Sequence, residues 1–306
     1  MTDTSHHLST VDLETEAFER RVEFQLTENK GKRLGAFFWV CAVIVGVTIF
    51  CALFCQWLPI QNPNTTTSAI EQLPSSAHWF GTDEIGRDIF SRVIWGSRVS
   101  VFVGFGAIAL GLLIGGTLGM LAAYLGGKFD LATTSILTIP LAFPVIIAVL
   151  VILGLWQPVD ITKLILVIGV FSVPLVYRLV RTATLTYSQR EFVTAAKALG
   201  AKNGRVLTRE VLPNVLPAAL TLALIGVSTV VIIEGTLSFL GKSVAIPAPS
   251  WGNMIYEGSQ QIQGYPGFQG YQIAFWPSLV MFLFLLSLTF IGDKLRALFD
   301  VADSRL

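Results

Sequence analysis

Six apolar runs, each long enough to cross a bilayer, constrain this chain more than any other feature. A helix needs roughly 20 apolar residues to span the hydrocarbon core of a membrane. Inside lipid the backbone must pair its own polar groups, so we expect each run to be a helix. Charged residues make up 13% of the 306 residues, about half the share of a soluble domain, which argues against a water-soluble fold. The predicted fold is all-α and polytopic, with six transmembrane helices at 34–58, 100–125, 131–156, 161–180, 215–240 and 272–291.

Lysine and arginine predict the orientation, because both are enriched in cytoplasmic segments. Most of the 21 lie on the cytoplasmic side if the N-terminus is cytoplasmic. We therefore expect a multi-pass protein of the cell (inner or plasma) membrane with both termini inside. The N-terminal segment shows no signal-peptide pattern. The predicted parts are a cytoplasmic tail at 1–33, helical in part near 13–26, a transmembrane domain at 34–292, external loops at 59–99 and 241–271, a cytoplasmic loop at 181–213 and a tail at 293–306.

Small residues and prolines mark two of the spans. Gly115 and Gly119 are four positions apart, a spacing that predicts close contact with a neighbouring helix. Pro140 and Pro144 should kink the third span. Such a kink is either tolerated by packing within the bundle or lines a cavity.

The first external loop ends in a pattern that predicts a short amphipathic helix. Thr82 is a suitable N-cap, and acidic residues follow it at the positive helix end. Asp83 with Arg87, and Asp88 with Arg92, stand at i,i+4 spacing with the acid first. Such a helix is expected to lie flat at the membrane interface.

The last external loop is rich in glycine, proline and aromatic residues, and it lacks the periodicity of a span. We expect an irregular segment that acts as a lid or a docking surface. Trp251, Tyr265 and Trp276 are expected at the membrane interface. The letters from Gly241 to Ser243 match the end of a phosphate-binding loop, but Thr236 stands where its first glycine belongs. Nucleotide binding is therefore not expected here.

One carboxylate lies well inside a predicted span. Glu234 falls near the external end of the fifth, and an ionisable residue at such a position usually faces the bundle interior or a wet cavity. Either it reaches the interface or caps a neighbouring helix, or it makes a structural or gating contact in a transport path. Ser238 and Trp251 join it as candidate pathway or gate residues.

The cytoplasmic loop has the pattern of two helices around a glycine. The first is expected at 189–199 and to end at Gly200 in the left-handed conformation. The second is expected to start at Asn203 and to break at Pro213. Its small, alanine-rich surface suits either a docking site for another protein or an ordinary basic loop.

The spacing in this loop resembles that of ABC importer permeases. Their loop has the letters EAA, then G after three further residues, I after nine more, and LP after one more. The family's glutamate and isoleucine are replaced by Thr194 and Glu210. In the family this loop seats in the ATPase subunit. The resemblance assigns ATPase coupling to Glu191, Thr194, Ala195, Ala196, Gly200, Leu212 and Pro213.

Further motifs resemble the "C" subunit of the dipeptide/oligopeptide permeases. Leu237–Gly241 with Pro249–Met254, and Gly292–Arg296, are similar to two of them. Lys242 and Ser243 depart from the family pattern. The resemblance covers about 35–300, and its external loop motif is carried by Gly81, Thr82, Asp83, Gly86, Arg87 and Asp88.

This resemblance implies a type I ABC importer permease that takes up peptides and is not itself an enzyme. It implies a second homologous permease, two ATP-binding subunits and an external substrate-binding protein, besides membrane lipid. ATP and Mg would bind to partner subunits, so no cofactor, metal or catalytic residue is expected in this chain, and the net charge of +1 gives no reason to expect nucleic acid. The alternatives are a non-peptide cargo (a metal chelate, glutathione or haem) or an ATP-independent secondary transporter.

Overall fold

The computed structural model describes residues 34–264 and 268–303. The chain divides into two units, Met1–Val40 and Cys41–Leu306. The predicted N-terminal tail with its helix near 13–26 lies outside the described residues, and so does Tyr265. The account below concerns the second unit.

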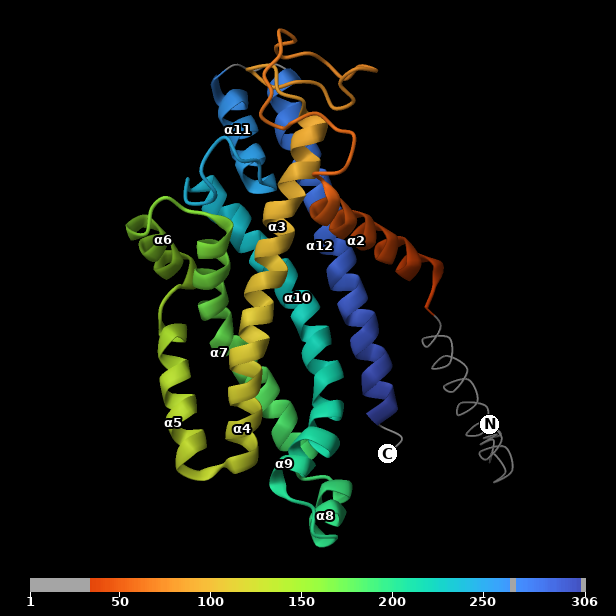
Figure 1. Ribbon diagram of the computed structural model, residues 1–306, viewed down its shortest axis with the longest axis vertical. Helices are drawn as coiled ribbons and strands as arrows, with labels where there is room; N and C mark the ends of the chain where they lie inside the picture. The colour runs from red at the N-terminus through yellow and green to blue at the C-terminus, as the bar shows by residue number, and fades with distance from the viewer. Residues whose placement is uncertain (1–33, 265–267, 304–306) are drawn as a thin grey trace, which may run out of the picture. The chain divides into compact units, whose positions relative to one another are not determined.

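Helices make up nearly all of the described chain, and the one β contact in it is an isolated bridge between Thr82 and Asp88. Figure 1 shows α11 and the segment before α3 at one end of the bundle, with α8 and α9 at the other. The helices are α2 (Ala36–Phe54), α3 (Ile89–Gly111), the π-turn η1 (Leu112–Gly116), α4 (Thr117–Leu125), α5 (Gly127–Thr138), the 3-10 turn η2 (Ile139–Ala142), α6 (Val145–Leu155), α7 (Ile161–Ser188), α8 (Glu191–Ala198), α9 (Asn203–Arg205), the π-turn η3 (Val206–Val211), α10 (Leu212–Phe239), α11 (Trp251–Gly264) and α12 (Phe268–Asp303).

The described helices provide five candidate membrane spans and one bent pair, which confirms six spans if the pair counts as one. The apolar segments are longer than the sequence predicted, because two of them join several elements end to end. One runs from α3 through η1 and α4, over Ile89–Leu125. Another runs from α9 through η3 and α10, over Asn203–Phe239.

The third predicted span is broken rather than merely kinked. The bend between Gly127–Ala142 and Val145–Leu155 is 82°. Phe143 has an extended backbone, as expected for a residue that precedes a proline. Pro144 then forms the N-cap of α6. The two prolines predicted to disturb this span therefore bracket the break.

A line of glycines brings the α3–α4 span against α7. A Cβ on Gly119 would lie 2.6 Å from the Tyr177 carbonyl oxygen, and one on Gly115 would overlap the Val173 carbonyl oxygen. Only hydrogen fits at both positions, so the predicted close contact is confirmed and its partner is α7.

The largest core cluster joins α3, α7, α10 and α12. It includes Val103, Leu164, Val231 and Phe284, all fully buried. Large apolar side chains also cover the outside of the bundle: Leu113 is 69% exposed and Leu155 is 86% exposed. In water such a surface would drive aggregation, whereas in a bilayer it faces hydrocarbon. The chain is a multi-pass membrane protein.

Candidate functional sites at the two ends of the bundle

At one end, α8 closes in the way the sequence predicted. Gly200 has a φ of 83°, and its amide donates to the Lys197 carbonyl at 3.0 Å. The Ala201 amide donates to the Ala196 carbonyl at 3.1 Å. This pair of bonds is the Schellman motif that ends a helix and turns the chain back.

Short contacts tie α8 to the rest of the bundle. Val193 is 1% exposed and packs with the buried apolar side chains of η3. The Lys197 ammonium lies 5.1 Å from the centre of the Tyr124 ring at the end of α4. The Tyr124 hydroxyl donates to Asn203 Oδ1 at 3.2 Å. A force applied to α8 therefore reaches both α4 and α10.

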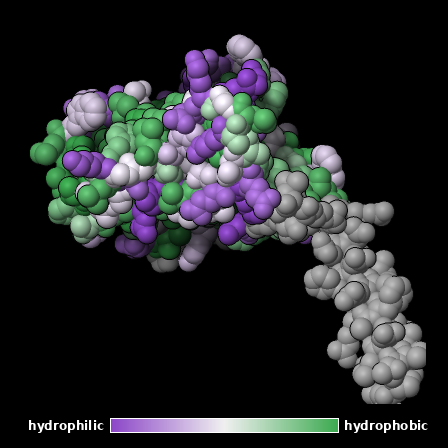
Figure 2. All heavy atoms as spheres, turned by 90° about the horizontal axis from the view of Figure 1, so that it is seen from below, coloured by the Kyte–Doolittle hydropathy of each residue, from purple (hydrophilic) through white to green (hydrophobic). Residues whose placement is uncertain are grey.

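The other face of α8 has no partner within the described chain. Leu199 is 89% exposed, and Phe192 is 38% exposed. Glu191, Thr194 and Ala195 lie on the same short helix and are also exposed. Figure 2, which views the molecule from this end, shows hydrophilic side chains gathered here with hydrophobic ones among them. An apolar tip in a polar surround is typical of a protein-docking surface.

The second helix of this loop differs from the prediction. It starts at Asn203 as expected, but it does not break at Pro213. Pro213 occupies the first turn of α10, and the helix runs on to Phe239. Proline has no amide hydrogen to donate. Pro213 follows the end of the π-turn η3, where the hydrogen-bond pattern of the helix already changes. Of the two coupling candidates here, Leu212 is half-buried and Pro213 is exposed.

At the opposite end, the motif around Gly81 and Gly86 forms a compact loop. Both glycines have positive φ values, and a Cβ on either would overlap a backbone oxygen, of Gln72 and Thr67 respectively. The Thr82 hydroxyl accepts from the Gln72 amide at 2.8 Å. These two glycines therefore allow the preceding segment to lie along the motif.

The predicted interfacial helix is absent from this region, because the helix begins later. Its N-cap is Asp88, whose carboxylate accepts from the Ser91 amide at 2.7 Å, and Thr82 caps nothing. Helix α3 then continues directly into the span. The other oxygen of Asp88 lies 2.9 Å from His78 Nδ1, so Asp88 does not form the pair predicted with Arg92.

Two arginines and two carboxylates form a buried ionic cluster, consisting of Asp83, Arg87, Arg92 and Glu257. Asp83 Oδ2 contacts Arg87 Nε at 2.5 Å and Arg92 Nη1 at 2.6 Å. Glu257 Oε2 contacts Arg87 Nη2 at 3.2 Å and Arg92 Nη2 at 2.9 Å. The charges balance, and the cluster joins the motif loop to α11.

The sequence predicted the contact between Asp83 and Arg87 but missed Glu257 and His78. Glu257 lies more than 160 positions from both arginines, so no local spacing could indicate it. It also lies on α11, where we expected an irregular segment. That expectation was wrong: Trp251–Gly264 is helical, and α12 begins at Phe268.

Glu234 is the centre of a second polar cluster, in which three serines of the described chain donate hydrogen bonds. It is 1% exposed. Ser238 and Ser243 donate to Oε1 at 2.9 and 2.8 Å, and Ser100 donates to Oε2 at 3.1 Å. The cluster joins α3, the end of α10 and the segment that follows it. Glu234 therefore does not reach the interface, and a structural or gating contact in a transport path stays a prediction.

Trp251 is fully buried, so it does not mark the membrane interface. Its indole nitrogen donates to the Val93 carbonyl at 3.0 Å. Gly252 allows the start of α11 to approach α10, because a Cβ there would lie 2.6 Å from Ser238. The start of α11 is therefore inserted between α3 and α10, beside the serines that bind Glu234.

Replacing Glu234 by glutamine should leave stability and uptake near the wild-type level. The amide oxygen can accept from Ser238 and Ser243, and the amide nitrogen can donate to Ser100. Replacing Glu234 by leucine removes all three bonds, each worth about 1.5–3 kcal/mol when the acceptor is charged. Thermal unfolding of the purified protein measures the difference. Equal damage from glutamine and leucine would show that the negative charge itself is required.

The fold and these two ends define a class: a multi-pass helical membrane protein with an exposed docking surface at one end. The chain belongs to the family described as "Binding-protein-dependent transport system inner membrane component", which it matches over residues 115–302.

Several relatives are similar over most of their length. The dipeptide transport system permease protein DppC of Alkalihalophilus pseudofirmus is 36% identical over 90% of this chain and 87% of its own. The glutathione transport system permease protein GsiD of Pectobacterium atrosepticum is 36% identical over 76% of this chain and 74% of its own. A solved structure of the MetNI methionine ABC transporter in an inward-facing conformation aligns with a TM-score of 0.57 at 20% identity, covering 69% of this chain and 97% of that one. This last likeness shows the fold.

Proposed function

We propose that the chain is a permease subunit of an ATP-driven importer of peptides. Its partners are a second homologous permease, two ATP-binding subunits and an external substrate-binding protein. ATP and Mg bind to the ATP-binding subunits, and this chain carries no catalytic residues. Both termini face the cytoplasm, so α8 lies on the cytoplasmic side and α11 on the external side.

The geometry of α8 is the observation that carries this proposal. A short helix with an exposed apolar tip is held by the buried Val193 and by the contacts of Lys197 on its other face. The tip, Leu199, offers a partner a contact, while Val193 and Tyr124 link the helix to the spans. ATP changes the arrangement of the two ATP-binding subunits, because a ligand shifts a conformational equilibrium through its different affinity for the two states. Helix α8 then transmits this change to the spans.

The external side carries the parts expected to meet the cargo-delivering protein. The ionic cluster and the serines around Glu234 hold the motif loop, α3, α10 and α11 together. The division into a tail at 1–33, a transmembrane domain with its loops at 34–292 and a second tail at 293–306 stays a prediction. The last of these begins inside α12, which continues to Asp303.

Peptide cargo is supported by relatives whose names refer to dipeptide or peptide transport. A second candidate is glutathione, because relatives of similar identity are glutathione permeases. The complex reconstituted in vesicles, with its binding protein outside, tests both cargoes. We expect uptake of labelled dipeptide that requires ATP. Uptake of glutathione but not of dipeptide would favour the second candidate, and uptake without ATP would contradict the proposal.

Replacing Gly200 by valine should uncouple ATP hydrolysis from uptake. A side chain at a φ of 83° costs about 1–2 kcal/mol, which distorts the end of α8. Because a Cβ added at Gly200 would have no other atom within 4 Å beyond its chain neighbours, the substitution creates no clash in the bundle, and membrane insertion should be normal. We expect uptake to fall about tenfold while ATPase activity persists.

Gly204 provides the matched control for this experiment. It lies four positions away in α9 and is exposed, and a Cβ added there would also meet nothing within 4 Å. Its φ lies outside the positive range, so Gly204→Val should leave uptake unchanged. Normal uptake by the Gly200→Val complex would contradict the role of α8.

A further inference from the structure

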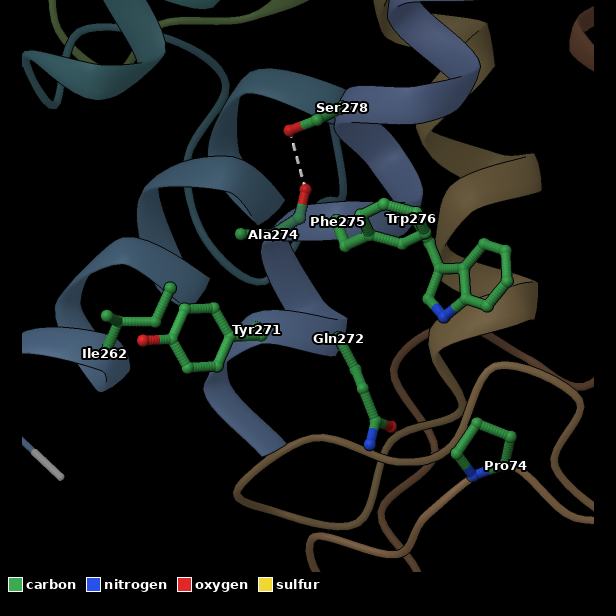
Figure 3. Close-up of a pocket in the computed structure, with 8 residues that line it drawn as sticks. All are labelled: Pro74, Ile262, Tyr271, Gln272, Ala274, Phe275, Trp276 and Ser278. Carbon is green, nitrogen blue, oxygen red and sulfur yellow. Dashed lines mark hydrogen bonds between the residues drawn. The ribbon is translucent and has the colours of Figure 1, made fainter. Parts of the chain in front are cut away.

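An apolar pocket of about 530 Å³ lies at the α11 end, around the first turns of α12. Figure 3 shows Ile262 of α11 facing Tyr271 of α12. Pro74, in the segment before the motif loop, lies near Gln272. Its volume is within the range of about 300–1,000 Å³ typical of ligand pockets. Its lining residues are Pro74, Ile262, Tyr271, Gln272, Ala274, Phe275, Trp276 and Ser278.

The walls of the pocket offer little to a polar ligand. The Ser278 hydroxyl donates to the Ala274 carbonyl of its own helix at 2.6 Å. Gln272 is 5% exposed, and its Nε2 has no hydrogen-bond partner among the described residues. Phe275 and Tyr271 present their rings outward, at 55% and 53% exposed. Water would find few partners here, whereas a hydrocarbon chain with one oxygen acceptor near Gln272 would match the lining.

The position of the pocket along α12 places it at the edge of the hydrocarbon layer. The charged residues of α12 begin at Asp293, towards the opposite end of the helix. Residues 271–278 therefore lie roughly 22–33 Å above that charge, where the hydrocarbon core of about 30 Å ends. Aromatic side chains are enriched at this depth, and lipid ester groups begin here.

We propose that this pocket binds a phospholipid of the leaflet at the α11 end, with an acyl chain along Phe275 and Trp276. Trp276 stacks on Phe80 of the motif loop with ring centres 4.0 Å apart. The bound acyl chain would thus contact α12, the helix against which the motif loop packs through Phe80. The inference requires the membrane-spanning fold and does not depend on the cargo, so the two can fail separately.

Tryptophan quenching by lipids tests the site directly. The assembled, delipidated complex is titrated in detergent with phosphatidylethanolamine carrying brominated acyl chains. We expect a saturable loss of fluorescence that the Trp276→Phe variant lacks. Phe275→Ala removes the central ring and should weaken the apparent affinity about tenfold. Ser278→Phe, at an exposed position, should block the pocket and abolish the saturable component.

Phe282 is the matched control. It lies two turns further along α12, is 58% exposed, and does not line the pocket. Phe282→Ala should leave the titration unchanged. Equal weakening by Phe275→Ala and Phe282→Ala would show unspecific coating of the helix and overturn the proposal. Absence of any saturable quenching in the assembled complex would show that lipid does not enter, as when the second permease covers the pocket, and would also overturn it.

Discussion

Replacing Arg92 by methionine is expected to lower the free energy of unfolding by about 3–5 kcal/mol. Arg92 is 1% exposed and contacts both Asp83 and Glu257. Without it, the buried Asp83 and the half-buried Glu257 share one guanidinium, that of Arg87, and one negative charge is uncompensated. Thermal unfolding of the purified complex measures the loss, and protease cleavage of the motif loop should increase in parallel.

A second substitution distinguishes charge balance from packing. In the double variant Arg92→Met with Glu257→Gln, the remaining pair of Asp83 and Arg87 is neutral again, so part of the lost stability should return. A double variant as unstable as the sum of its parts would contradict this explanation. An Arg92→Met variant as stable as wild type would show that the cluster contributes no net stability.

Replacing Gly119 by alanine is expected to destabilise the contact between α4 and α7. The new Cβ would lie 2.6 Å from the Tyr177 carbonyl oxygen and 3.1 Å from the Arg181 amide nitrogen. Both are backbone atoms, so the helices must separate, at a cost of about 1–3 kcal/mol. The midpoint of thermal unfolding in detergent should fall accordingly.

Gly116 serves as the control for helix propensity. It is also buried, and its added Cβ would meet only Val180 Cγ2, at 3.9 Å. Alanine favours a helix over glycine by about 1 kcal/mol at either position. Gly116→Ala should therefore be neutral or slightly stabilising. If Gly119→Ala behaved in the same way, α4 and α7 would not be in close contact.

The spans and the turn at Gly200 could be predicted because local composition determines them. Apolar length indicates a membrane helix whatever its neighbours are, and a glycine after a helix indicates a left-handed cap. The break between α5 and α6 was indicated by Pro140 and Pro144, although the sequence alone did not predict the size of the bend.

The parts at the α11 end were predicted less well, because long-range contacts determine them. Thr82 has the composition of an N-cap, but its hydroxyl is bonded to the preceding loop, and Asp88 caps the helix instead. Helix α11 has few apolar positions, and it forms because Trp251 is buried against α3 and Glu257 meets Arg87 of the motif and Arg92 of α3. Neither partner lies nearby in the sequence.

The π-turn η1 gives the α3–α4 helix one residue more than a regular helix would hold. Gly111, Gly115 and Gly119 all face α7, although positions eight apart on a regular helix drift by roughly 80°. The extra residue cancels this drift and keeps the three glycines in phase. A regular helix over the same residues would rotate Gly119 away from α7 by roughly 80°, whereas deleting Leu113, which is 69% exposed, would place Gly119 seven positions after Gly111 and keep the two glycines within roughly 20° of one another. The contact between α4 and α7 therefore depends on the π-turn as well as on the glycines.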